Sequence, residues 1–196
     1  MEPAFSSTWS IDEKAVSRDD RVMKHCGSLE TQGGPILLVD ADAASSWGGV
    51  ETADYSKLIH ACGPEGCELT VGGGRAVAWE PEGGGIIEVF ADEVSAVLCK
   101  IMALDPDESR DVAVLNAAVA RPVTSAVIGS VDICSGKVAI FWSPVSGREI
   151  ARPRMVGEKA VMLSVGIGRF VCGTEQHQTP RSEVWCCRIV REQQSP

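Results

Sequence analysis

One short segment limits what this chain can fold into more than any other. Residues 36–39 are Ile-Leu-Leu-Val, four consecutive apolar residues that follow the turn sequence Gly33-Gly34-Pro35. Neighbouring side chains of a strand point to opposite faces, so this unbroken run predicts a strand buried on both faces. A chain of 196 residues is long enough to build a core, as one domain of average size or two small ones.

The first half of the chain is expected to mix short helices with strands. Asp40 can cap a helix over residues 41–47, and the apolar spacing over residues 92–104 predicts the best helix of the chain. Gly72-Gly73-Gly74 predicts a tight hairpin, because glycine readily adopts the positive φ angles that such turns need. The other expected elements are a helix over residues 53–61 and strands over residues 68–71, 76–80 and 86–90.

After residue 105 the pattern contains strands only. Turn sequences such as Ser135-Gly136 and Ser146-Gly147 separate the segments. The expected strands are residues 112–119, 125–133, 137–142, 160–165, 169–172 and 183–190.

Mixed elements followed by strands alone predict an α+β fold. We expect an N-terminal mixed α/β lobe followed by a mainly antiparallel β lobe, with the boundary near residues 105–110. The expected parts are an N-terminal arm over residues 1–30, an acidic α+β lobe over residues 31–106 and an antiparallel β lobe over residues 107–192.

The charge of the chain is concentrated in one segment. Residues 40–93 contain 11 acidic residues against two basic ones, Lys57 and Arg75, which is a net charge of −9 and equals that of the whole chain. One interpretation is a solvated face that keeps the protein soluble, and another is a surface that attracts a basic partner. The overall charge and a pI of 4.8 argue against nonspecific nucleic-acid binding.

The chain contains no membrane or secretion signal that we recognise, and we expect it to be cytoplasmic. Its eight cysteines are then expected to be mostly free thiols that pack as small apolar side chains. Cys62 and Cys67 are spaced too loosely for a typical zinc site, and His60 beside them is the nearest approach to one. The sequence therefore predicts no bound metal and no cofactor.

No catalytic motif is recognisable. The chain has three histidines, none of them in a His-Glu-x-x-His arrangement, and it has no Gly-x-Ser-x-Gly. We therefore expect a binding protein and not an enzyme. Two alternatives remain open: an enzyme whose site is assembled from distant carboxylates, or from Cys62 or Cys172 with a histidine, and an accessory domain that self-associates.

The order of several short motifs resembles the immunity protein twenty-one family. The motifs are Gly33-Gly34-Pro35 with its apolar strand, Trp47-Gly48-Gly49, Asp54-Tyr55 and the glycine triplet within residues 69–77. Near the C-terminus, Gly168-Arg169-Phe170-Val171 and the strand over residues 184–191 are also similar, so that the resemblance covers roughly residues 28–192.

The chain departs from the family pattern at two places. Where the family usually continues Asp-Tyr with Asp-Arg-Ala-Cys, this chain has Ser56-Lys57-Leu58-Ile59, and the expected acidic turn is only partly present as Glu80-Pro81-Glu82. Such surface differences bear on which partner is bound, because specificity depends on surface positions.

Members of this family are predicted bacterial antidotes encoded beside polymorphic toxins. The resemblance implies that this chain binds and neutralises a cognate toxin, and the acidic bias favours a basic one. Trp47 and Tyr55 would be aromatic anchors, although both could instead pack in the core. The residues expected to bind the partner are Asp42, Trp47, Glu51, Asp54, Tyr55, Glu65, Glu80 and Glu82.

Overall fold

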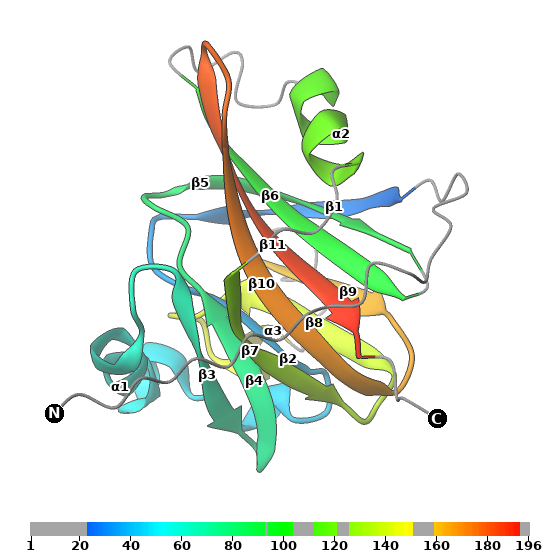
Figure 1. Cartoon of the computed structure of the whole chain (residues 1–196). Helices are drawn as coiled ribbons and strands as arrows, with labels where there is room; N and C mark the ends of the chain where they lie inside the picture. Colours follow the sequence, from blue (N-terminus) through cyan, green and yellow to red (C-terminus); the bar gives the residue numbers. More distant parts are fainter. Residues whose placement is uncertain (1–22, 93, 104–111, 121–125, 151–158, 193–196) are drawn as a thin grey trace, which may run out of the picture.

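The computed structural model describes residues 23–92, 94–103, 112–120, 126–150 and 159–192, which form two antiparallel β-sheets packed face to face (Figure 1). The six-stranded sheet contains, in spatial order, β1 (Lys24–Thr31), β5 (Gly85–Ala91), β6 (Ser95–Ala103), β11 (Ser182–Arg191), β10 (Gly168–Gln178) and β7 (Ala126–Ile133). The five-stranded sheet contains β3 (Gly66–Val71), β4 (Gly74–Trp79), β2 (Ile36–Asp40), β8 (Lys137–Trp142) and β9 (Ala160–Ser164). The short helices are η1 (Ala44–Ser46), η2 (Gly49–Glu51), α1 (Asp54–Ala61), α2 (Val112–Ala120) and α3 (Gly147–Ile150).

Both sheets combine strands from the two halves of the sequence. In the six-stranded sheet β6 pairs with β11, and in the five-stranded sheet β2 pairs with β8. The expectation of an α+β chain with mainly antiparallel strands is confirmed, whereas the expected division into two successive lobes near residues 105–110 is not confirmed, because each sheet takes strands from both halves. Residues 1–22 of the expected N-terminal arm lie outside the described residues, and Lys24–Thr31 is a strand paired with β5.

Two segments have the opposite secondary structure from the one that the sequence predicts. Residues 92–104 were predicted to be helical, but Ser95–Ala103 is β6, with Leu98 facing the other sheet and Val97 facing outward. An apolar run that is buried on both faces has no period that separates helix from strand. Residues 112–119 were predicted to be a strand, but they belong to α2, whose four alanines favour a helix.

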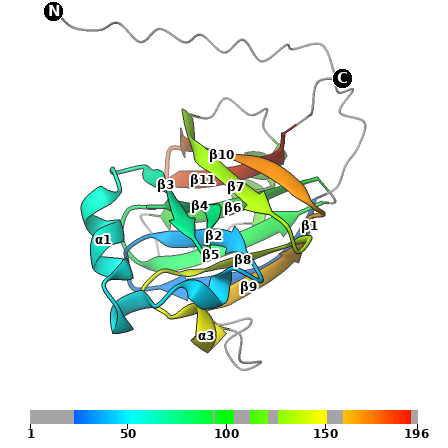
Figure 2. The ribbon, with the colours of Figure 1, turned by 90° about the horizontal axis from the view of Figure 1, so that it is seen from below.

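Strand β2 is buried on both faces, as its apolar run predicts. Ile36 and Leu38 point into the core between the two sheets, while Leu37 and Val39 point outward. The outward side chains pack under η1, α1 and the loop before α3, which lie away from β10 and β11 (Figure 2). The five-stranded sheet is therefore the middle of three layers over much of its area.

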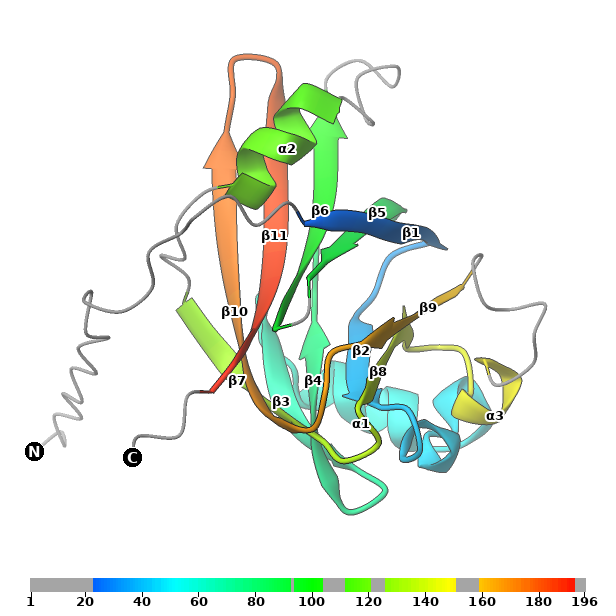
Figure 3. The same ribbon diagram turned by 90° about the vertical axis from the view of Figure 1, so that its right-hand side faces the viewer.

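Helix α2 covers the outer face of the six-stranded sheet. It lies across β6, β11 and β10, on the opposite side of the molecule from α1 and α3 (Figure 3). Its Leu115 and Ala118 pack against Val97, Ile101 and Val184 of the sheet. This contact forms a third, smaller apolar core.

Polar contacts join β7 of the six-stranded sheet to β3 and β4 of the other. The Glu68 carboxylate accepts hydrogen bonds from the backbone N–H of Ser130 at 2.8 Å and from its hydroxyl at 2.9 Å. Arg75 donates to Asp132 at 2.9 Å. Gly129 permits this close approach, since a Cβ at that position would lie 2.7 Å from the Cβ of Glu68.

The glycine triplet forms the expected tight hairpin between β3 and β4. Val71 pairs with Gly74, which leaves Gly72 and Gly73 as the two turn residues, with φ angles of 60° and 84°. Two successive positive φ angles define a type I′ turn, whose twist matches that of the flanking strands.

Asp40 does not cap a helix over residues 41–47; only the short 3₁₀ helix η1 forms within that range. Its carboxylate instead accepts hydrogen bonds from the N–H groups of Cys134 and Ser135, both at 2.7 Å, and from the Ser135 hydroxyl at 2.9 Å. Burial acts to raise the pKa of Asp40, but the hydrogen bonds from Ser135, Cys134 and Asp42 outweigh it and lower the pKa. One carboxylate thus connects β2 to the link between β7 and β8.

We predict that Asp40→Asn lowers the free energy of unfolding by about 2–3 kcal/mol, because an amide has one acceptor oxygen where the carboxylate has two, so its NH₂ group must face N–H donors either of Cys134 and Ser135 or of Asp42. Urea unfolding at neutral pH measures the loss, and Asp42→Asn, at an exposed position, serves as the matched control. Because the folded pKa is lowered, the contribution is full above the ordinary pKa of 3.8 and is lost as the pH falls through the folded value. A difference between the two variants that persists in strong acid would contradict this account.

Candidate functional site

The two predicted aromatic anchors are not both available to a partner. Trp47 is 4% exposed, and its indole N–H donates to the Ser143 carbonyl at 2.7 Å, so it is a core residue in this structure. Tyr55 is half-buried and packs against the same core. The anchor role of Trp47 is therefore corrected: its ring fills the space between the sheet and η1.

The predicted acidic residues are divided among three places. Glu65 and Glu80 are neighbours, since the Glu80 N–H donates to the Glu65 carbonyl at 3.4 Å. Asp42 lies beyond the other end of β2, two residues after Asp40, and is exposed. Glu51 is exposed on η2, and the half-buried Asp54 accepts a hydrogen bond from the N–H of Gly48 at 3.0 Å.

A buried lysine offsets part of this acidic charge. Lys100 is 2% exposed, and its ammonium group donates to the carbonyls of Glu82 and, at 2.6 Å, Gly83. Burial lowers the pKa of Lys100, and the charges of Glu80 and Glu82 act in the opposite direction. Burial likewise raises the pKa of Glu80. Glu80 and Glu82 therefore stabilise Lys100 as well as carrying charge near the surface.

The surroundings of Cys62 and Cys172 give little support to the alternative that either cysteine is a catalytic nucleophile. Cys172 is fully buried between the sheets, and burial raises its pKa to about 12, so it stays a thiol. Cys62 and Cys67 are half-buried neighbours, and burial is the first cause that raises the pKa of Cys62. The exposed His60 ring is hydrogen-bonded to the carbonyl of Ser56 at 2.6 Å. All eight cysteines lie in the described part of the chain, and each is a free thiol.

A second polar cluster lies beneath α2, and sequence reasoning missed it. Glu175 of β10, Cys186 of β11 and Cys99 of β6 are register partners, so they form one row across three strands. His177 and Arg188 occupy the next positions on the same face. The available signal was the pair of alternating patterns Glu175-x-His177 and Cys186-x-Arg188, which strand pairing brings together.

The centre of this cluster is a buried ion pair. The Arg188 guanidinium binds the Glu175 carboxylate, and both side chains are 4% exposed. Arg188 also donates to the carbonyls of Ala118 and, at 3.2 Å, Val119, in the last turn of α2. A cation is favourable at this end of a helix, so Arg188 both balances Glu175 and attaches α2 to the sheet.

The other members of the cluster are chemically reactive types. The Nε2 atom of His177 lies 3.5 Å from Oε2 of Glu175, and the Sγ atoms of Cys99 and Cys186 lie 3.4 Å apart. The ligand atoms of Glu175, His177 and Cys186 all lie within 4.8 Å of one another. The hydrogen bond to Cys186, followed by burial, raises the pKa of Cys99.

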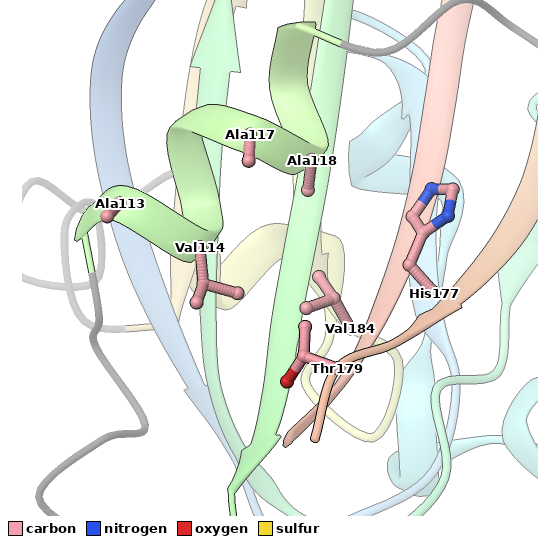
Figure 4. Close-up of a pocket in the computed structure, with 7 residues that line it drawn as sticks. All are labelled: Ala113, Val114, Ala117, Ala118, His177, Thr179 and Val184. Carbon is pink, nitrogen blue, oxygen red and sulfur yellow. The ribbon is translucent and has the colours of Figure 1, made fainter. Parts of the chain in front are cut away.

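An apolar pocket of about 240 Å³ opens beside this cluster (Figure 4). His177 is its one titratable lining residue, and its side chain is 13% exposed. The remaining lining residues come from α2 and from the β10–β11 hairpin: Ala113, Val114, Ala117, Ala118, Thr179 and Val184.

Comparisons with known proteins identify no relative. No family model matches the chain, and neither a curated protein nor a solved structure matches it. Among the described residues, no helix is long and apolar enough to cross a membrane. Functional inference therefore rests on the residues and their geometry.

We predict that Trp47→Ala lowers the free energy of unfolding by about 3–5 kcal/mol, because it leaves a cavity and an unpaired Ser143 carbonyl. Thermal or urea unfolding measures the loss. An unchanged melting temperature combined with weaker binding to a partner would restore the anchor role.

We predict that Arg188→Ala costs about 3–5 kcal/mol, because it leaves the Glu175 carboxylate buried without its cation. The double variant Glu175→Leu, Arg188→Met removes both charges and should recover most of that loss. Urea unfolding of the two variants shows whether the loss comes from the unpaired Glu175 charge or from the missing Arg188 contacts to α2. If the contacts to α2 dominate, the double variant will be as unstable as Arg188→Ala.

Proposed function

We propose that this chain is a non-enzymatic binding protein that neutralises a basic protein partner, namely a bacterial toxin. The proposed contact is the acidic layer, which we define as residues 41–65. The observation that carries the proposal is the charge of this layer: it holds four acidic residues and one lysine, and it lies on the outside of the five-stranded sheet. Among the described residues, no basic side chain forms an ion pair with Asp42, Glu51 or Glu65.

The acidic layer also carries exposed apolar side chains. Val50 is 63% exposed and precedes Glu51, and Ile59 on α1 is 43% exposed. Apolar side chains supply contact area that is removed from water on binding, whereas surrounding carboxylates set orientation. Val50 and Ile59, and not the buried Trp47, are therefore the proposed apolar contacts to the partner.

Electrostatic attraction gives such a protein a kinetic advantage. An antidote must reach its toxin before the toxin reaches its target, so its association rate matters as much as its affinity. Charges at the rim of an interface raise the association rate and make it dependent on salt. If the toxin is a nuclease, its basic substrate groove would be the complementary surface.

The order of short motifs that resembles the immunity protein twenty-one family agrees with the same proposal, although no family model matches the chain. It implies a cognate toxin encoded nearby, a cytoplasmic site of action and no catalytic role. A reducing cytoplasm agrees with eight free thiols, four of which, Cys26, Cys62, Cys67 and Cys134, are exposed or half-buried.

We predict that the variant Asp42→Asn, Glu51→Gln, Glu65→Gln slows association about tenfold or more at low salt and flattens its salt dependence. Asp54 is left intact, because its carboxylate holds the N–H of Gly48. The measurement is stopped-flow association with the toxin domain encoded by the neighbouring reading frame, at low and at physiological salt.

The matched control removes the same number of negative charges elsewhere. Glu30→Gln, Glu183→Gln, Glu192→Gln changes residues outside the acidic layer and should associate at nearly the wild-type rate. If both variants associate equally slowly, the slower association depends only on net charge, and the acidic layer is not the contact. A failure of the neighbouring protein to bind would refute the toxin partner.

A further inference from the structure

We propose that the cluster beneath α2 is a zinc-binding site, in which Glu175, His177 and Cys186 bind the ion and Cys99 completes a tetrahedral set. This site is separate from the acidic layer and does not depend on the proposed function. The four residues come from β6, β10 and β11, so their common location is a product of strand register.

The distances within the cluster suit a tetrahedral ion. With bonds of about 2.1 Å to nitrogen and oxygen and about 2.3 Å to sulfur, such a set places N and O about 3.4 Å apart and two S atoms about 3.8 Å apart. The His177–Glu175 distance is 3.5 Å and the Cys99–Cys186 distance is 3.4 Å. The ligand atoms of Glu175, His177 and Cys186 already lie within 4.8 Å of one another, whereas Cys99 lies outside that group and must turn toward it to become the fourth ligand.

An unsatisfied carboxylate oxygen is the independent sign of a ligand. Among the described residues, Oε2 of Glu175 accepts no hydrogen bond, although its side chain is 4% exposed. Burying an acceptor without a partner is costly, and most such groups in proteins have one. The oxygen lies on the side of Glu175 that faces His177, where the ligand atoms of His177 and Cys186 are within reach.

The charges of the occupied site would balance. A divalent ion with one carboxylate and two thiolates has a net charge of −1, which the Arg188 guanidinium offsets. Arg188 holds the other carboxylate oxygen of Glu175, which is the role of an outer residue that orients a metal ligand. Neutrality favours Cys99 over water as the fourth ligand, because the site is buried.

Binding is a simple ligand exchange. Two thiols each lose a proton to solvent as two sulfur–zinc bonds form, and neither zinc nor sulfur changes its oxidation state. Zinc is favoured over harder cations because the set contains two sulfurs and one imidazole. With four protein ligands the site would be structural, and it would stabilise the strands to which Arg188 attaches α2.

The test uses the full chain, reduced and treated with a chelator, and titrates it with Zn²⁺ and with Co²⁺ as a spectroscopic probe. We expect one equivalent to bind, with the sulfur-to-cobalt charge-transfer absorption and the visible bands of a tetrahedral site. Cys186→Ser should weaken binding by about 100-fold or more. Zn²⁺ should also raise the melting temperature of the wild type.

The controls separate this cluster from other thiols. Cys187→Ala changes the adjacent cysteine, which faces the core between the sheets, and should keep full binding. Cys62→Ser, Cys67→Ser removes the other close thiol pair and should also keep it. His177→Gln changes a partly exposed ligand and provides a test if Cys186→Ser does not fold; it should bind weakly and gain no thermal stability from Zn²⁺. Less than stoichiometric binding by the wild type, or binding that is lost in the Cys62, Cys67 variant and kept in His177→Gln, would overturn the proposal.

Discussion

The architecture depends on burial of the five-stranded sheet on both of its faces. Its central strand β2 has apolar side chains at every position from Ile36 to Val39, so neither face can be left in water without exposing about half of them. The six-stranded sheet covers one face, and the short helices and loops of residues 41–61 and 143–150 cover much of the other. The interleaving of strands from both halves of the chain follows, because β4 and β8 must flank β2.

Acidic residues serve two physical purposes in this protein. Some are structural acceptors: Asp40 holds the link between β7 and β8, and Glu68 holds β7 beside β3. Glu88 is 8% exposed, and its carboxylate is hydrogen-bonded to the His25 ring at 2.7 Å. A count of acids along the sequence includes the buried Asp40 and Glu88 and the exposed but hydrogen-bonded Glu68, so it exceeds the number of carboxylates that are free to act on a partner. The acidic layer holds a part of that charge which the fold leaves largely in solvent.

Local sequence signals predicted those elements that local physics decides. The hairpin at Gly72 and Gly73 follows from the need for positive φ, and the burial of β2 follows from its unbroken apolar run. The prediction failed for β6 and α2, because both segments are mostly apolar and their hydrophobic period does not separate helix from strand. The secondary structure of these two segments depends on their position in the fold. Strand β6 pairs with β5 and β11, and α2 packs its Leu115 and Ala118 against the outer face of these strands.

The sequence by itself determined the composition of the surface charge, the turns, and the strand that must be buried. Only the tertiary structure decided that Trp47 lies in the core, because the partner of its indole is Ser143, 96 residues away. The cluster of Glu175, His177, Cys186 and Cys99 is of the same kind, since Cys99 and Cys186 are separated by 87 residues and meet through the register of β6 and β11. Register is set by the summed pairing and packing of whole strands, so no local spacing of ligands records it.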